Sequence, residues 1–295
     1  MPTSPAPLVI AGVDGSPSSR SAVRVAAGEA AIRGGTLRLV HAFNWLPTPA
    51  ASGGPAPRQL LSHAAEQAAR TAPGLAVTTE LTEGEPLRVL LRRSRQAVLA
   101  VIGAGDLASR VCLPRDSLAL QFTARATVTV MVTPAGPATT GPVVVGLCGG
   151  DNAAATLDVA FDMAAHRRTG LVVVHAWADD DDPRDPSVHG LVESHARKHG
   201  ISARIRLVEG DPIDVMRQAS RDAGLVVVGA RGRLPHRGSI GSVTQTLLHH
   251  SSAPLVVVRG SPEAPGRASC VVGTFAPDPR ARSGARWRWT RGETP

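Results

Sequence analysis

The sequence predicts an α/β protein made of two tandem open domains, each with a five-stranded parallel sheet and about four helices. Three observations predict this fold. Similar segments recur in the same order in the two halves of the chain. Within each half, short apolar runs alternate with helical patterns, which is typical of βαβ units. Hydrophobic residues make up 43% of the 295 residues but aromatic residues only 3%, as suits a valine-rich sheet between alanine-rich helices.

The repeat rests on two spaced matches. LVIAGVDGS, from Leu8, corresponds to VVVGLCGGD, from Val143, and each segment leads through a helix to a strand that reads VHAF or VHAW. Farther along, EGEPLRV, from Glu83, corresponds to EGDPIDV, from Glu209. Since a repeat fixes the architecture of both copies, we expect the same folding unit twice.

Composition suggests where the domains end. TPAGPATTGP, at residues 133–142, is rich in proline, glycine and threonine, as expected of a linker. We therefore expect a first domain over residues 1–136 and a second over residues 137–260. Residues 261–295 combine arginine, proline and glycine without sustained periodicity, which predicts a disordered basic tail.

The apolar runs place the elements of the second domain. Helices fill the gaps between strands, and two helices of the chain begin with a capping side chain before proline, at Ser16-Pro17 and Asp211-Pro212. The strands are expected at Val143–Leu147, Leu171–Trp177, Ala203–Val208, Leu225–Gly229 and Leu255–Arg259.

Composition and missing motifs argue against several classes of function. Part of the net charge of +8 lies in the tail and the rest of the chain is only mildly basic, so a nucleic-acid partner is not expected. Three widely spaced cysteines indicate neither a disulfide framework nor a zinc ribbon. No apolar run reaches the length of a membrane span, and we expect a cytoplasmic protein. Neither a GxxxxGK[ST] loop nor a GxSxG motif occurs, which argues against a P-loop NTPase and an α/β-hydrolase.

A glycine-rich loop is the candidate binding site. It follows the fourth strand of the second domain and reads GARGRLPHRGSIGSVTQ from Gly229. In open parallel sheets, ligands bind where strand ends meet helix N-termini. Glycines let the backbone approach an anion, Ser242 is expected to cap the next helix, and Arg231 adds positive charge. A plain flexible connection is the alternative interpretation.

In its context, this loop resembles the universal stress protein family, whose signature is glycine, two residues, glycine, nine residues, glycine, then serine or threonine. LLHHSSAPLVVVR after the loop, VDGS at Val13 and the VHAF and VHAW strands resemble the same family. The resemblance covers residues 8–260 and implies an adenine nucleotide alpha hydrolase-like, Rossmann-like fold. It also implies that the closing strands, from Thr127 and Leu255, pair edge to edge as an intramolecular pseudo-dimer, while further homo-oligomerisation stays open.

In members of the family that bind ATP, a carboxylate at the end of the first strand holds the nucleoside and the glycine loop holds the phosphates. The resemblance therefore implies ATP, with Mg²⁺, as the cofactor. Neither a catalytic residue nor a metal ligand is expected. The implied nucleotide-binding residues are Asp14, Gly15, Ser16 and Gly103 in the first domain and Gly229, Arg231, Gly232, Gly241, Ser242 and Val243 in the second.

Each domain departs from the signature in a different part. The second has Cys148 in place of the expected nucleoside anchor, unless Asp151 replaces it, and its loop has eight residues where the signature has nine. The first keeps Asp14, but Asp106 and Asp116 stand at glycine positions, where carboxylates repel phosphate. We therefore expect a nonenzymatic stress-response protein that binds adenine nucleotide mainly in its second domain and acts through protein partners. A nucleotide-free interaction scaffold is the alternative, and weak ATP hydrolysis stays open.

Two pairs of histidines complete the candidates. His195 and His199 lie four residues apart on an expected helix near the acidic run Asp179–Asp182, a spacing that suits a metal. Because spacing fixes no third ligand, a solvated helix face is the favoured interpretation. His41 and His175 stand at equivalent strand ends and are expected to pack beside the nucleotide pocket.

Overall fold

The computed structural model describes the chain in several ranges. It divides into two compact units, Met1–Ser261 and Pro262–Pro295. In the second unit only the backbone of two short segments is described. The described residues are 6–43, 56–105, 117–137, 139–147, 152–177, 186–230, 240–259, 273–277 and 287–291.

Strands and helices alternate in both domains, which confirms the predicted five strands and four helices of each. The first domain contains β1 (Leu8–Gly12), α1 (Pro17–Ile32), β2 (Thr36–Phe43), α2 (Pro57–Thr71), β3 (Val77–Glu83), α3 (Pro86–Ser94), β4 (Leu99–Gly103), α4 (Leu118–Arg125) and β5 (Val130–Thr133). The second contains β6 (Val143–Leu147), α5 (Ala153–Arg167), β7 (Leu171–Trp177), α6 (Pro186–His199), β8 (Ala203–Glu209), α7 (Pro212–Ala219), η3 (Ser220–Asp222), β9 (Leu225–Gly229), α8 (Ser242–His250) and β10 (Leu255–Val258).

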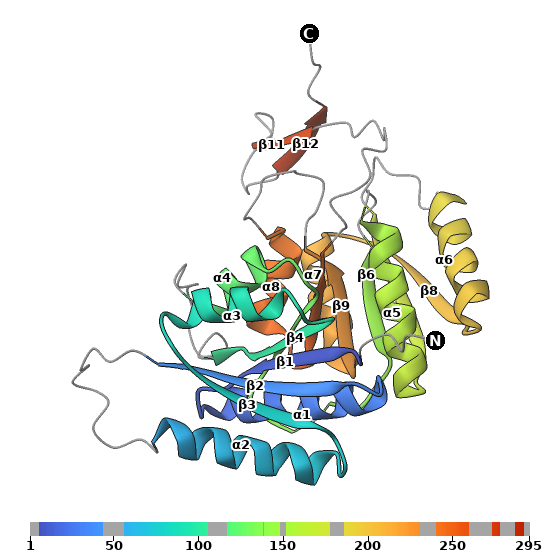
Figure 1. Cartoon of the computed structure of the whole chain (residues 1–295). Coiled ribbons are helices and arrows are strands. Elements are labelled where there is room, and N and C mark those ends of the chain that lie inside the picture. The colour runs from blue at the N-terminus through green and yellow to red at the C-terminus, as the bar shows by residue number, and fades with distance from the viewer. Residues whose placement is uncertain are drawn as a thin grey trace. The chain divides into compact units, whose positions relative to one another are not determined.

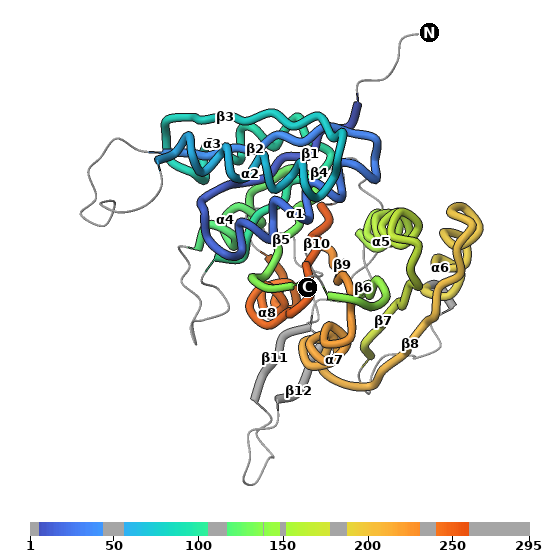
Figure 2. The backbone as a smooth tube through the Cα atoms, turned by 90° about the horizontal axis from the view of Figure 1, so that it is seen from below, coloured from blue at the N-terminus to red at the C-terminus, as the bar shows by residue number. Residues whose placement is uncertain are grey.

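In the described part of the first unit, ten strands form one sheet, in the order β3-β2-β1-β4-β5-β10-β9-β6-β7-β8 (Figure 1). All pairs within a domain are parallel, and the two halves have the same internal order. β5 and β10 join the halves antiparallel, with Leu255 opposite Val132 and Val257 opposite Val130, and they lie side by side in Figure 2. The expected pairing of the closing strands is confirmed.

Helices cover both faces of the sheet. Val9 and Ala11 of β1 pack in one apolar cluster, with α1, α2, α5 and α6, whereas Ile10 packs in a second cluster, with α3, α4, α7 and α8. Figure 1 shows α1 and α2 on the opposite side of the strands from α3 and α4. Strands buried on both faces need apolar residues at successive positions, which explains the valine-rich runs.

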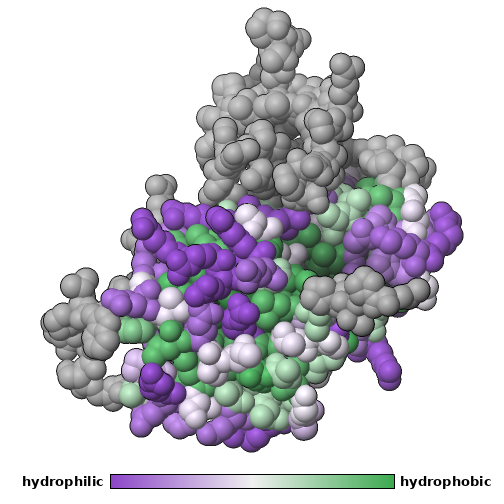
Figure 3. Space-filling model, viewed as in Figure 1, coloured by the Kyte–Doolittle hydropathy of each residue, from purple (hydrophilic) through white to green (hydrophobic). Residues whose placement is uncertain are grey.

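The outer surfaces of α3 and α6 are polar. Figure 3 shows hydrophilic residues gathered over α3 and α6. Exposed basic side chains on these helices include Arg88, Arg197 and Lys198. Among the described residues, none of the helices combines the length and the apolar character needed to cross a membrane.

A buried ion cluster joins α1 and α5 across the two domains. Glu29 and Arg33 of α1 occupy the same positions of the repeat as Met163 and Arg167 of α5. Arg167 Nη2 donates to Glu29 Oε1 at 2.7 Å, and Arg33 pairs with Glu29 Oε2. Arg33 Nη2 also lies 3.3 Å from Met163 Sδ. The Glu29 side chain is 3% exposed, so one buried carboxylate forms ion pairs with both arginines.

The second unit contains β11 (Gly273–Pro277) and β12 (Trp287–Arg291), which pair antiparallel. This differs from the expectation of a tail without regular structure. Tryptophan and threonine in WRWTR favour strands, which accounts for the difference. The rest of the tail lies outside the described residues, and the domain bounds of the sequence analysis stay predictions.

Candidate functional site

The candidate site of each domain lies at the carboxyl ends of its central strands. β1 pairs with β2 on one side and with β4 on the other. β6 pairs in the same way with β7 and β9. In open α/β sheets, the point where strand order reverses leaves a crevice at the carboxyl ends of the strands. By this rule, the candidate sites are at the ends of β1 and β4, and of β6 and β9.

The turn after β1 is organised by its own polar groups. Asp14 Oδ1 accepts a hydrogen bond from Ser16 N at 2.9 Å, and Ser16 Oγ accepts one from Ser19 N at 3.1 Å. Ser16 therefore caps α1, as predicted. Gly15 has a φ of 81°, a left-handed conformation that favours glycine, and a Cβ there would lie 2.7 Å from Leu60 Cδ2. The structure thus brings Asp14, Gly15 and Ser16 into one compact turn.

Gly103 ends β4 directly against the first turn of α1. A Cβ on Gly103 would lie 2.6 Å from the carbonyl carbon of Ser18 and 2.7 Å from Ser19 N. Only glycine allows this approach. Two residues on, Gly105 N donates to Ser18 Oγ at 3.0 Å. This N–H, which a phosphate in the first domain would need, is therefore already paired within the protein.

In the second domain, the end of β9 is joined to the start of α8. Gly241 N donates to Ala230 O at 3.2 Å, and Thr244 Oγ1 donates to Gly229 O at 3.0 Å. The buried Thr244 was not singled out from the sequence, although a hydroxyl in the first turn after a glycine was an available signal. The structure brings together Gly229, Gly241, Ser242 and Val243, whereas Arg231 and Gly232 lie outside the described residues.

The prediction that Ser242 caps α8 is wrong. Gly241 holds the cap position, with φ −62° and ψ 152°, and Ser242 is the exposed first residue of the helix. A helix cap needs this extended backbone. Gly241 adopts it, so the helix starts one residue earlier than a cap at Ser242 would allow. Because glycine has no side-chain acceptor, the first N–H groups of α8 need partners from the loop, from solvent or from an anion.

Several residues of the sequence argument cannot be placed. The nucleoside-anchor candidates of the second domain, the acidic residues of the first loop and the acidic run before α6 all lie outside the described residues. These are Cys148, Asp151, Asp106, Asp116 and Asp179–Asp182.

Both domains repeat one histidine contact beside the site. His41 Nδ1 lies 2.6 Å from Val13 O, and His175 Nδ1 lies 3.1 Å from Leu147 O. Because a carbonyl oxygen only accepts, Nδ1 carries the proton in both rings. Both histidines are half-buried at the ends of β2 and β7, as expected for packed residues.

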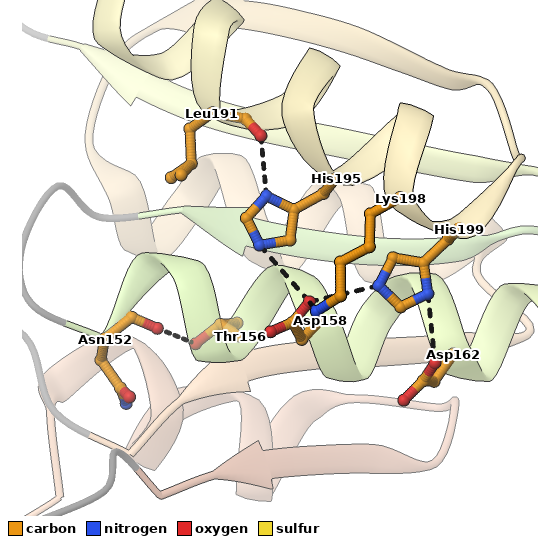
Figure 4. A network of polar contacts seen from close by, with 8 residues as sticks. All are labelled: Asn152, Thr156, Asp158, Asp162, Leu191, His195, Lys198 and His199. Carbon is orange, nitrogen blue, oxygen red and sulfur yellow. Dashed lines mark hydrogen bonds and ion pairs between the residues drawn. The ribbon is translucent and has the colours of Figure 1, made fainter.

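The expectation that His195 and His199 lie on a solvated helix face is wrong. Both rings stack on Phe161 of α5, with centroids 6.2 and 5.5 Å away, and His195 is 8% exposed. Asp158 and Asp162 of α5 face the rings (Figure 4). The packing of two helices buries them: His199 lies 41 positions along the chain from Asp158, a contact that local spacing cannot reveal. Within the described ranges, no group of three or more His, Cys, Asp or Glu side chains has the geometry of a metal site.

The fold and its two strand-end turns define a tandem open α/β protein with one candidate binding crevice in each half. The model of the Universal stress protein family matches residues 8–134 and 140–259. The chain belongs to the universal stress protein family.

Relatives align over nearly their whole length. Universal stress protein Rv2623 of Mycobacterium tuberculosis (strain ATCC 25618 / H37Rv) is 30% identical over 290 residues, covering 86% of this chain and 96% of that protein. Universal stress protein Mb2028c of Mycobacterium bovis (strain ATCC BAA-935 / AF2122/97) is 29% identical over 286 residues, covering 86% and 97%. A solved universal stress protein from Archaeoglobus fulgidus DSM 4304 has a TM-score of 0.67 at 15% identity, covering 85% of this chain and 96% of that one, a likeness of fold alone.

Proposed function

We propose that this protein is a nonenzymatic universal stress protein that binds ATP or a related adenine nucleotide, with Mg²⁺, mainly in its second domain. The nucleotide-bound protein would act through its interactions with protein partners. The observation that carries this proposal is the glycine cap of α8 at the end of β9, where Gly241 bonds to Ala230. A helix start without a capping side chain presents N–H donors and the positive end of the helix dipole to an anion.

The first domain is proposed to bind nucleotide more weakly. There, hydroxyl groups of the protein already accept hydrogen bonds from the amides near the site. Ser16 Oγ accepts from Ser19 N, and Ser18 Oγ accepts from Gly105 N. This internal pairing favours the alternative function, a nucleotide-free interaction scaffold, for the first domain.

Calorimetric titration of the full chain with ATP and Mg²⁺ tests the proposal through Gly241→Asp. Aspartate is a preferred helix cap, so α8 should keep its structure, but the new carboxylate accepts the N–H groups that a phosphate needs. We expect saturable binding by the natural chain and a loss of about tenfold or more in the variant, because like charges a few Å apart repel.

Gly241→Ala is the matched control, since it adds a side chain without charge, and Gly232→Asp probes the same loop. If the natural chain binds no ATP at millimolar concentration, the scaffold alternative replaces the proposal. ATP turnover that disappears in Gly241→Asp would contradict the nonenzymatic part.

A further inference from the structure

α6 packs on α5 through two histidines that face an acceptor at both ring nitrogens. His195 Nδ1 lies 2.8 Å from Leu191 O, and its Nε2 lies 3.5 Å from Asp158 Oδ1 (Figure 4). His199 Nε2 lies 3.2 Å from the same oxygen of Asp158, and its Nδ1 lies 3.2 Å from Asp162 Oδ1. Four ring nitrogens therefore meet three acceptor oxygens.

The protons of the rings can be counted from these contacts. A carbonyl oxygen and an ionised carboxylate have no hydrogen to donate. A neutral imidazole has one N–H, whereas an imidazolium has two. When neutral, each ring therefore turns one lone pair toward an acceptor. When protonated, each ring donates at both ends, so the observed geometry suits the charged form.

Two carboxylates and one ammonium group also face the rings. They are Asp158, Asp162 and Lys198, whose Nζ lies 2.7 Å from Asp158 Oδ1. With neutral rings the cluster carries one net negative charge. Burial raises the pKa of Asp158, but hydrogen bonds from Lys198 and His199 and the charges of His195 and Lys198 lower it by more. The pKa of Asp158 is therefore below its ordinary value, and this acceptor stays ionised into the acid range.

The other described charged groups on β8 and α6 point to solvent. On β8, Ile205 packs in the same apolar cluster as α6, whereas its neighbours Arg204 and Arg206 are exposed. Glu193 and Arg197 lie 4.0 Å apart as an exposed pair on α6 itself. Among the residues that the structure describes, the three charges named above are the ones that face the histidines.

We propose that His195, His199, Asp158 and Asp162 form a proton-operated latch, in which protonation of the histidines fastens α6 to α5 and loss of the protons loosens α6. Histidine side chains in general change their charge between about pH 5 and 8, so the latch is tested across that range. It links pH to the helix that follows β6, the first strand of the second domain: Asn152 precedes α5, and its Nδ2 donates to Val258 O of β10 at 3.2 Å. The latch stands whether or not the site binds nucleotide.

Hydrogen exchange of the full chain at pH 5.5 and 8.0, corrected for the intrinsic pH dependence of amide exchange, tests the latch. We expect the protection of Val188–His199 in α6 to fall by about tenfold from pH 5.5 to 8.0, as charge-assisted hydrogen bonds are lost. The equivalent helix α2 (Pro57–Thr71) should change less than about twofold, because it packs through apolar residues and one hydrogen bond from Gln67 to Arg20 O, an amide–carbonyl contact that does not change its charge. In the double variant His195→Gln/His199→Gln, the pH effect on α6 should disappear.

Two further variants keep the test decisive. Asp162→Asn removes the negative charge that faces His199 from an exposed position, so it should reduce the pH effect even if the double variant folds poorly. His63→Gln, on the exposed face of α2, is the matched control and should leave the effect unchanged. Equal protection of α6 at both pH values in the natural chain would overturn the latch. So would protection at pH 8.0 that Zn²⁺ restores and EDTA removes, since that identifies a metal site.

Discussion

Equivalent helix pairs of the two halves are joined by different chemistry. α1 and α2 bury small apolar side chains against each other and the sheet, including Ala26 and Ala68. Between α5 and α6, two histidines stack on Phe161 and face two carboxylates, one of which also pairs with a lysine. Both helix pairs cover the same face of the sheet. The comparison shows that buried apolar side chains maintain the fold, while a few polar side chains determine whether a helix contact depends on pH. A contact between apolar side chains does not depend on pH, whereas a contact between titratable side chains does.

The largest expected effect concerns the contact of α1 with α5 across the two domains, where Glu29 of α1 corresponds to Met163 of α5. We expect Glu29→Gln to lower the free energy of unfolding by about 3–5 kcal/mol, since Arg33 and Arg167 lose their buried carboxylate. Denaturant unfolding of the full chain measures this. Adding Met163→Glu should restore part of the loss, because the two positions are equivalent in the repeat.

Glu66→Gln is the control for that prediction. Glu66 lies 4.0 Å from Arg70 on the exposed face of α2, where an ion pair contributes about 1 kcal/mol or less. If Glu29→Gln has an equally small effect, the ion pairs of Glu29 with Arg33 and Arg167 do not stabilise the contact between the two halves.

A smaller loss is expected for Gly103→Ala, at the close approach of β4 to α1 in the first half. Its Cβ would meet the backbone of Ser18 at 2.6 Å, so we expect a loss of about 1–3 kcal/mol in thermal unfolding. The control is Gly12→Ala, whose Cβ would first meet Ile102 Cγ2 at 3.4 Å, a side chain that can move by a few tenths of an ångström. Equal losses of stability for the two variants would show that the close contact between β4 and α1 does not require glycine at position 103.

The smallest effect concerns Asp158, whose pKa is lower in the folded protein than its ordinary value. Its stabilising contribution is therefore present above about pH 4 and is lost as the pH falls through the lowered pKa. The side chain is 38% exposed, so solvent screening limits the contribution to about 1 kcal/mol or less. Denaturation at pH 7 and pH 2 should show Asp158→Asn less stable than the natural chain only at pH 7.

Arg24 of α1 occupies the corresponding position in the first half, where its Nη2 donates to Gly136 O at 2.9 Å. Arg24→Gln should therefore have the same effect at both pH values. A pH-dependent loss there would mean that the two helix pairs do not differ as described.

Much of the fold follows from local rules of sequence. The predicted strand Leu171–Trp177 is observed with the same bounds, because an apolar run between turns determines a buried strand. The predicted cap Asp211 accepts from Ile213 N at 2.8 Å. The cap of α8 lies one residue before its predicted place, at Gly241, because both residues there are compatible with a cap and backbone geometry decides between them.

Contacts between distant helices could not be predicted in this way. His199 lies 41 positions from Asp158, and Arg167 lies 138 positions from Glu29. No local pattern relates such pairs, since their meeting depends on how two helices pack on a sheet. The sequence therefore located the strand-end turns of the candidate sites, while the histidine latch required the structure.

The antiparallel seam between β5 and β10 has a consequence for the evolution of the two halves. Two separate chains that pair through identical surfaces come apart on dilution, and every residue must complement its own copy. Within one polypeptide, a short connection keeps the second half at an effective concentration in the millimolar range, however scarce the protein is. Each half is thereby released from self-complementarity, so a position that changes in one half need not change in the other.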